Sequence, residues 1–161
     1  MNSLVVYASR SGNTRAVAEA IATQLSSRGP AQLLAADEVG PELPPGLDLL
    51  VVGGPTEGHG MTEPMTALLD RLNTFSVRGI AAAAFDTRVR WPRWLSGSAA
   101  EGIGQRLEQL GARVVVPAES FMVSTKPVLE PGELKRAADW ASNLADLVAA
   151  AAGPALVTQE A

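Results

Sequence analysis

Short apolar runs alternate along this chain with longer segments in which apolar residues recur every three or four positions. The apolar runs predict strands at residues 3–7, 31–36, 48–53, 79–85 and 113–117. The run at 48–53, DLLVVG, is apolar almost throughout, which is typical of a strand buried on both faces in a parallel sheet. The run at 31–36 is the weakest and is expected at a sheet edge. Residues 119–124 could extend the fifth strand beyond Pro117.

The periodic segments predict helices between the strands. Val17, Ile21 and Leu25 lie four residues apart, on one face of a helix over residues 14–28 that ends at Gly29-Pro30. Further helices are expected at residues 63–73, 98–110 and 131–150, and loops at residues 37–47 and 86–97. Strands that alternate with helices in this way predict an α/β fold with three layers, built on a doubly wound, five-stranded parallel sheet.

Composition and charge narrow the class of protein. The chain has 161 residues, of which 47% are hydrophobic and 19% charged, as expected for a soluble globular protein. We expect a single domain over residues 1–152 and a flexible tail over residues 153–161. The net charge of −4 argues against nucleic acid and anionic membranes as partners. The absence of cysteine excludes disulfides, thiol catalysis and cysteine-based metal sites.

Neither a secretion signal nor a membrane span is expected. A strand begins almost at the first residue, without a basic region or a cleavable apolar segment before it. The most apolar stretches are short or rich in alanine, so none predicts a membrane-spanning helix. These features predict a cytoplasmic protein.

Unusual polar chemistry gathers in the loops that follow the first, third and fourth predicted strands. In doubly wound sheets, ligands bind beyond the carboxyl ends of the strands, where the strand order reverses. The first of these loops, SRSGNT at residues 9–14, leads into a helix N-terminus, which carries about half a positive charge and several unpaired N–H donors. Hydroxyl and amide side chains add donors, and Gly12 allows a ligand to approach the backbone closely. The loop therefore predicts a phosphate site.

The simplest alternative is that this loop only caps the helix. A cap requires one polar side chain, such as Ser11 or Asn13, whereas four of the six residues can serve in this way. The loop is not a Walker phosphate loop, because no Gly-Lys-Ser/Thr follows it. The dinucleotide fingerprint is also absent, because Gly102 and Gly104 lie in a predicted helix and lack the third glycine.

The segment VVYASRSGNTRAVAEAI resembles the phosphate-binding signature of the flavodoxin family. That signature has two apolar residues, an aromatic residue, a Ser or Thr, then a small residue and a Thr, and finally an Ala. The matching residues are Val5, Val6, Tyr7, Ser9, Gly12, Thr14, Ala18 and Ile21. The segment VVGGPTEGHG is similar to the family's second flavin loop, and the order of elements matches over nearly the whole chain.

The resemblance implies the flavodoxin-like strand order 2-1-3-4-5 and FMN as the cofactor. One set of residues is thereby implied to hold the FMN phosphate: Ser9, Arg10, Ser11, Gly12, Asn13 and Thr14. A second set is implied along one edge of the isoalloxazine ring: Pro55, Thr56, Glu57, Gly58, His59 and Gly60. A third set is implied along the other edge: Asp86, Thr87, Arg88, Trp91 and Trp94.

The chain departs from the family pattern in its aromatic residues. Family members often stack an aromatic residue of the second loop on the flavin, but here that loop has Glu57 and His59 and no aromatic residue. Trp91 and Trp94 of the third loop either make this contact or cover the core. Trp140, on the last predicted helix, is expected in the core.

The charged residues of these loops allow more than one role. The third loop brings Arg88, Arg90 and Arg93 against Asp86 alone, and the arginines form either a solvated face or a patch for an acidic partner. His59, the only histidine, suggests acid–base chemistry or metal binding together with a nearby glutamate. An isolated pair of this kind on a glycine-rich loop more often contacts solvent or a ligand, so no metal site is expected.

Three functions are compatible with these residues. The one we expect is an FMN protein that shuttles electrons between a reductase and an acceptor protein, with FMN doing the chemistry. The second is a flavodoxin-like oxidoreductase acting on a quinone or a porphyrinogen, with His59 or Arg88 near the substrate. The third is a flavin-free binding or regulatory domain, because a fold does not determine a function.

Overall fold

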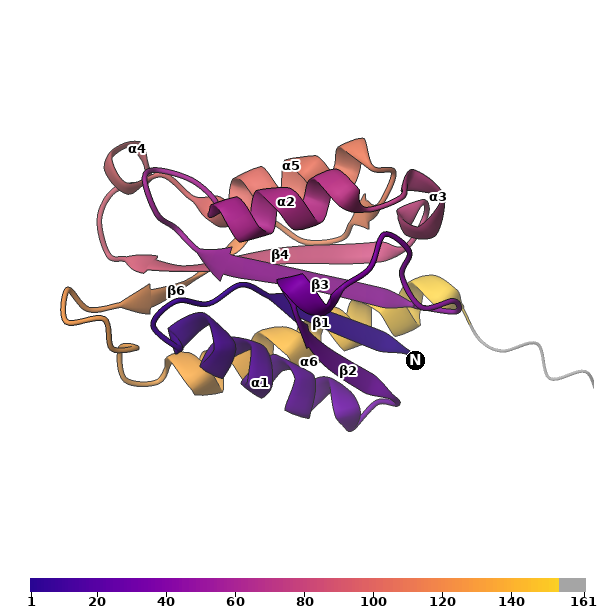
Figure 1. The fold of residues 1–161 in the computed structure, drawn as a ribbon. Helices are drawn as coiled ribbons and strands as arrows, with labels where there is room; N and C mark the ends of the chain where they lie inside the picture. The colour runs from indigo at the N-terminus through magenta and orange to yellow at the C-terminus, as the bar shows by residue number, and fades with distance from the viewer. Residues whose placement is uncertain (154–161) are drawn as a thin grey trace, which may run out of the picture.

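A parallel sheet runs through the molecule, and helices cover both of its faces (Figure 1). The computed structural model describes residues 1–153, so residues 154–161 of the predicted tail lie outside the described residues. The strands are β1 (Ser3–Tyr7), β2 (Ala31–Ala35), β3 (Leu49–Pro55), β4 (Ala81–Val89), β5 (Arg113–Val114) and β6 (Glu119–Val123). Their order is β2-β1-β3-β4-β5, and β6 also pairs with β4. The predicted doubly wound sheet and its strand order are confirmed.

The long helices form one layer on each face of the sheet (Figure 1). One layer holds α1 (Asn13–Ser26) and α6 (Glu133–Ala152). The other holds α2 (Glu63–Arg71) and α5 (Ala99–Gln109). Three short helices complete the fold: η1 (Ala36–Glu38), α3 (Thr74–Val77) and α4 (Arg93–Ser96). The sequence did not predict these short helices, and the helix expected to reach residue 73 ends at Arg71.

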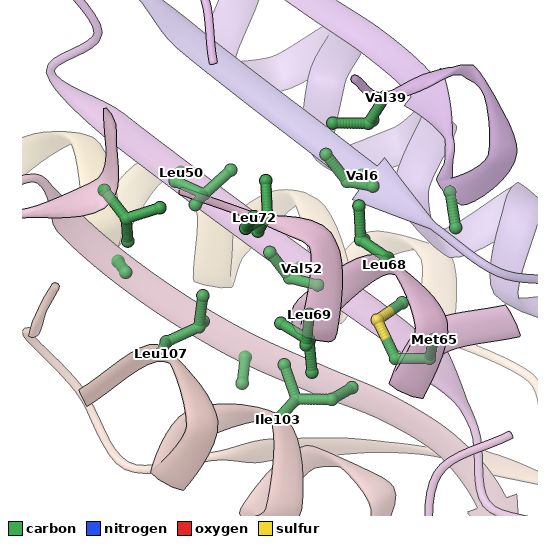
Figure 2. Packing of buried hydrophobic residues seen from close by; sticks show 14 of the residues in the cluster. Val6, Val39, Leu50, Val52, Met65, Leu68, Leu69, Leu72, Ile103 and Leu107 are labelled. Atoms are coloured by element: carbon green, nitrogen blue, oxygen red, sulfur yellow. The ribbon is translucent and has the colours of Figure 1, made fainter. Parts of the chain in front are cut away.

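Alternate residues of the central strands face opposite helix layers, which explains why their sequences are apolar throughout. In β3, Leu50 and Val52 belong to the cluster under α2 and α5, which also contains Leu68 of α2 and Ile103 of α5 (Figure 2). Leu49 and Val51 belong to the cluster under α1 and α6. Helices therefore cover both faces of the sheet, and a ligand can bind only at the ends of the strands.

An aromatic cluster fills the layer under α6. The rings of Phe85, Phe121 and Trp140 meet edge to face, with centroids 6.0 to 6.3 Å apart. A Cβ atom at Gly53 would lie 2.2 Å from the Phe85 ring, so a glycine in β3 makes room for this ring. Trp140, which was expected in the core, is partly buried and packs against this core cluster.

The fourth and fifth strands differ from the sequence prediction. β4 continues to Val89, so residues 86–89 belong to a strand and not to the predicted loop. The strand expected at residues 113–117 is shorter, because only Arg113–Val114 pair with β4 there and β6 pairs with the later part of β4. Pro117, which has no N–H group to donate, lies in the interruption. The predicted continuation over residues 119–124 is confirmed as β6.

Candidate functional site

Three loops meet at the carboxyl edge of the sheet, because the parallel strands all end there (Figure 1). We call residues 8–12 the phosphate loop, residues 56–62 the second loop and residues 90–98 the third loop. A fourth segment, residues 124–132, joins them, because the Asn13 side-chain amide donates a hydrogen bond to the Pro127 carbonyl at 2.8 Å. No sequence pattern predicted a role for this fourth segment.

The N-terminus of α1 offers free hydrogen-bond donors. Ser9 Oγ accepts the backbone N–H groups of Gly12 and Arg15, at 3.1 and 3.4 Å. Five other backbone N–H groups between residues 9 and 14 have no acceptor within residues 1–153: those of Ser9, Arg10, Ser11, Asn13 and Thr14. The first turn of this 14-residue helix contains no acidic residue to offset its dipole. Free N–H donors, together with a helix dipole that no acidic side chain offsets, favour the binding of a phosphate dianion.

The side chain of Thr14 points into the protein. It is buried, and its Oγ1 lies 2.7 Å from Oγ1 of Thr87 in β4. Both threonines were expected to contact the cofactor, but in the structure their hydroxyls satisfy each other. Any contact between Thr14 and a phosphate is therefore left to its backbone N–H group.

The second loop contains a tight hairpin turn. The backbone N–H and C=O groups of Glu57 and Gly60 exchange hydrogen bonds of 2.9 and 3.0 Å. Gly58 and His59 between them have φ angles of 53° and 71°, and His59 is the one non-glycine residue with positive φ in the described part of the chain. A left-handed conformation costs a residue other than glycine about 1–2 kcal/mol. The surrounding loops must therefore hold His59 in place.

The third loop packs directly against this turn. A Cβ atom at Gly97 would lie 2.0 Å from the His59 carbonyl oxygen, and Gly97 has a φ of 70°. A glycine is required at this contact for both reasons. The second and third loops are thus held together through their backbones.

Asp86 and Thr56, both expected along the flavin ring, instead cap the N-terminus of α5. Asp86 is fully buried, and its Oδ2 accepts hydrogen bonds from Thr56 Oγ1 (3.0 Å), Ser98 Oγ (2.8 Å) and the Ala100 N–H (3.0 Å). The Ala99 N–H in turn donates to Thr56 Oγ1 at 2.8 Å. Asp86 therefore positions the second loop and α5 through Oδ2, while its Oδ1 is buried without a partner in the described residues, 1–153. Its contact with the flavin stays a prediction. The Ser98-x-x-Glu101 spacing was the sequence signal for this cap.

Arg88 also has a positioning role in the structure. Its Nε donates to Ser120 Oγ at 3.0 Å, and a terminal nitrogen donates to the Trp91 carbonyl at 2.8 Å and to Ser96 Oγ at 3.3 Å. The guanidinium group therefore ties β4 to β6 and to the backbone of the third loop. Its position along the flavin ring stays a prediction.

The other arginines around the loops are paired with glutamates. Arg90 pairs with Glu130 at 2.6 Å, and the hydrogen bond that Arg90 donates to Glu130 raises the pKa of Arg90 above its usual value. Arg93 pairs with Glu101. The prediction that the arginines of the third loop are opposed by Asp86 alone was wrong, because the glutamates lie in more distant segments of the sequence.

Both tryptophans of the third loop lie at the surface. Trp94 is 85% exposed and Trp91 is 51% exposed, and the neighbouring Leu95 is 44% exposed. The alternative that these tryptophans cover the core was therefore wrong. They form an apolar rim around the loops and are available to a cofactor or a partner.

A cleft of about 520 Å³ opens beside the phosphate loop, at the carboxyl ends of β1 and β2. It is lined by Tyr7, Ala8, Ser9, Arg10, Gly12, Arg15, Ala35, Ala36, Asp37, Pro55, Thr62 and Pro64. None of these residues belongs to the third loop. The cleft therefore lies over the ends of β1, β2 and β3, and it includes Pro55 and Thr62 as well as the phosphate loop.

The described residues, 1–153, contain no candidate metal site and no candidate membrane span. No group of three or more His, Asp or Glu side chains there is placed to hold a metal ion. No helix in this part of the chain has the length and apolar character needed to cross a membrane.

Comparison with known proteins identifies the protein family. The family model described as Flavodoxin matches residues 5–142. A flavodoxin from the domain Archaea is similar with a TM-score of 0.74 and 25% sequence identity, over 92% of this chain and 99% of that protein. Oxidised flavodoxin 1 from Bacillus cereus is similar with a TM-score of 0.76 and 19% sequence identity, over 91% of this chain and 98% of that protein. A WrbA-like flavodoxin from Agrobacterium tumefaciens is similar with a TM-score of 0.71 and 21% sequence identity, over 92% of this chain and 98% of that protein.

Proposed function

Because the chain belongs to the flavodoxin family, whose cofactor is FMN, we propose that it carries electrons between a reductase and an acceptor protein. The observation that carries this proposal is the set of free N–H donors at the start of α1, which suits the single terminal phosphate of FMN. Bound FMN supplies the redox chemistry. The chain holds the cofactor, orients it and controls access to it.

The phosphate loop holds the phosphate in this proposal. The Ser9 hydroxyl, which caps α1 by accepting two N–H groups, keeps its own proton free to donate to a phosphate oxygen. Arg10 lies next to it and is paired only weakly with Glu57, at 3.4 Å and with its side chain 79% exposed. Its guanidinium group can therefore turn toward a dianion at little cost.

The flavin ring lies between the second and third loops in this proposal. Their backbones are fixed relative to each other by the contact of Gly97 with His59 and by the buried carboxylate of Asp86. These contacts keep the two loops from collapsing or separating when the ring enters. Trp91 and Trp94 stand at the rim, where they can cover an edge of the ring.

Redox partners dock on the same rim. Trp91, Trp94 and Leu95 are exposed there, while Arg90 and Arg93 are neutralised by glutamates. The rim is therefore more apolar than charged, and we expect partner binding to depend only weakly on salt.

The visible absorption spectrum of the purified protein, followed by titration with FMN, tests this function. A flavin spectrum is expected, and the cofactor released by heat should run as FMN on chromatography. A colourless protein without affinity for FMN would support a flavin-free binding domain instead. Oxidation of NAD(P)H or a hydroquinone without a partner protein would support an oxidoreductase.

A further inference from the structure

A second cleft, of about 400 Å³, lies at the end of the molecule opposite the three loops. It opens where β3, β4 and β5 begin and where α6 ends, on the side of the molecule away from α4 of the third loop (Figure 1). The nine residues of β4 separate the two ends by roughly 25 Å. None of the residues that line this cleft belongs to the phosphate loop, the second loop or the third loop. It is therefore separate from the proposed flavin site, and its volume is within the range of small-molecule sites.

Two arginines that line this second cleft are left without partners. Within residues 1–153, the guanidinium groups of Arg78 and Arg113 form no ion pair and donate no hydrogen bond. Every other arginine in that part of the chain pairs with a carboxylate or donates to an oxygen atom. The two exceptions lie on the same cleft, so it holds cationic donors that the described residues do not satisfy.

Backbone hydrogen bonds hold the two arginines on neighbouring segments. The N–H group of Gly79, the residue after Arg78, donates to the Gly111 carbonyl at 2.8 Å. The N–H group of Arg113 donates to the Ile80 carbonyl at 2.9 Å. The segment before β4 and the start of β5 are thus fixed beside each other. A guanidinium group binds a carboxylate through two parallel N–H···O bonds, so the pair of arginines suits a carboxylate ligand.

The second cleft also carries negative charge. Asp48 lines it and accepts the Asn2 backbone N–H through Oδ2 at 2.6 Å, while its Oδ1 accepts no hydrogen bond from residues 1–153. Ala151 and Ala152 bring the C-terminal end of the 20-residue helix α6 to the same cleft. That end carries about half a negative charge, and the last turn has no basic residue to offset it. Since Asp48 forms no ion pair in the described part of the chain, it does not neutralise the arginines.

Apolar side chains lie between these charges. Leu47, Ile80 and Val148 line the second cleft, and each is only partly buried where it packs against the core. Covering them with an apolar group would remove more of their surface from water. A simple anion would pair with the arginines but would be repelled by Asp48 and by the end of α6, and a simple cation would meet the reverse. A ligand that carries both charges and an apolar group satisfies all three parts of the cleft.

We propose that this second cleft binds a free α-amino acid with an apolar side chain. Arg78 and Arg113 bind the carboxylate of the ligand. Asp48 accepts hydrogen bonds from its ammonium group, which the C-terminal end of α6 also attracts. The side chain of the ligand lies on Leu47 and Val148. This site uses none of the residues assigned to FMN, so it does not rest on the proposed electron-carrier function.

Isothermal titration calorimetry on the full-length protein, with and without added FMN, tests the proposal. L-Leucine should bind with a Kd below about 1 mM in both cases. Isocaproate is leucine without its amino group, and isoamylamine is leucine without its carboxylate. Each analogue should bind at least about tenfold more weakly than leucine, because it leaves one charged part of the cleft without a partner.

Three variants and their matched controls locate the binding. Arg78→Gln and Arg113→Gln should each weaken leucine by about tenfold and reduce its advantage over isoamylamine. Asp48→Asn, which keeps an oxygen for the N-terminal backbone, should reduce the advantage of leucine over isocaproate. All three residues are exposed, so folding is not at risk. Arg28→Gln and Asp139→Asn change charged residues that do not line the cleft, and they should leave leucine binding unchanged.

The proposal is overturned if leucine binds with a Kd above about 1 mM, if both analogues bind as well as leucine, or if the Arg78 and Arg113 variants bind leucine like the wild type. Displacement of leucine by FMN would also overturn it, because the two sites lie at opposite ends of the sheet. Leucine binding that depends on both arginines in a protein without FMN affinity would support this cleft and reject the electron-carrier function. The two proposals therefore fail independently.

Discussion

Thr14 Oγ1 and Thr87 Oγ1 lie 2.7 Å apart in the buried interior, where they join the helix behind the phosphate loop to the strand that leads into the third loop. The preceding residue, Asp86, faces the other helix layer and joins Thr56 to α5. Two neighbouring residues of β4 therefore fix the relative positions of all three loops. Their buried side chains therefore position the loops of the site.

Thr87→Val should destabilise the protein by about 1–3 kcal/mol, because it leaves the buried Thr14 hydroxyl without a partner. The double variant Thr14→Val/Thr87→Val should lose much less than the sum of the two single variants, because it removes both polar groups. Urea unfolding of the four proteins measures these free energies. Additive losses would contradict the contact.

Ser9→Ala should weaken FMN binding by about 10- to 100-fold and riboflavin binding much less, because riboflavin lacks the phosphate. Fluorescence titration of the apoprotein with each flavin measures both affinities. Ser27→Ala, at the other end of α1, is the control, because the Ser27 hydroxyl donates only to the Gln24 carbonyl. Equal losses for the two flavins would show that Ser9 does not contact the phosphate.

The sequence predicted the fold well because the local pattern and the global arrangement agree. The strand β3 is buried at residues 49–54, so all of these positions are apolar or glycine. The end of β4 carried no such signal, because Asp86, Thr87 and Arg88 are polar and their partners come from other segments. A strand of this kind is stabilised by its pairing with β6, which a local pattern does not reveal.

The candidate site was predictable only in part, for a related reason. The phosphate loop is contiguous in sequence, so its donors could be recognised together. The partner of Asp86 in the second loop is 30 residues away, and that of Arg90 is 40 residues away. Which side chains cap, pair or face a ligand depends on these distant contacts. The cleft at Asp37 likewise exists only once β1 and β2 are placed side by side.

The stability of the protein should fall in acid through Glu133. Glu133 is nearly buried and accepts hydrogen bonds from the Arg136 side chain and from the Met122 N–H. The hydrogen bond from Arg136 is the main cause that lowers the pKa of Glu133, while burial opposes it. A carboxylate with a lowered pKa stabilises the folded state at neutral pH, and this contribution is lost as the pH falls through the folded pKa.

Glu133→Gln should therefore be less stable than the wild type by about 1–3 kcal/mol at pH 7. The difference should shrink as the pH falls below 4.5, the ordinary pKa of the side chain, because the wild-type carboxylate then becomes neutral as well. Urea unfolding at pH 7 and at pH 3 measures the difference. Glu108→Gln, on the exposed side of α5, should change little at either pH. A constant difference would reject the ion pair as its origin.

The exposed tryptophans of the third loop allow the position of the flavin ring to be tested. Trp91 and Trp94 are 51% and 85% exposed, whereas Trp140 packs in the core against Phe85. A ring that stacks on one of the exposed indoles should quench its fluorescence when FMN binds. Trp91→Leu or Trp94→Leu should therefore reduce the quenching, and the remaining signal should come mainly from the other two tryptophans.

The same substitution should weaken FMN and riboflavin equally, because stacking acts on the ring that both flavins share. An aromatic stack contributes about 0.5–1.5 kcal/mol, so the expected loss is a few-fold to about tenfold. This pattern is the opposite of that expected for Ser9→Ala, and the two variants together separate ring contacts from phosphate contacts. Phe75→Leu replaces an 86% exposed aromatic residue on α3 and should leave both affinities unchanged. If quenching and affinity are unchanged in both tryptophan variants, the ring does not reach the rim, and Trp91 and Trp94 serve the partner alone.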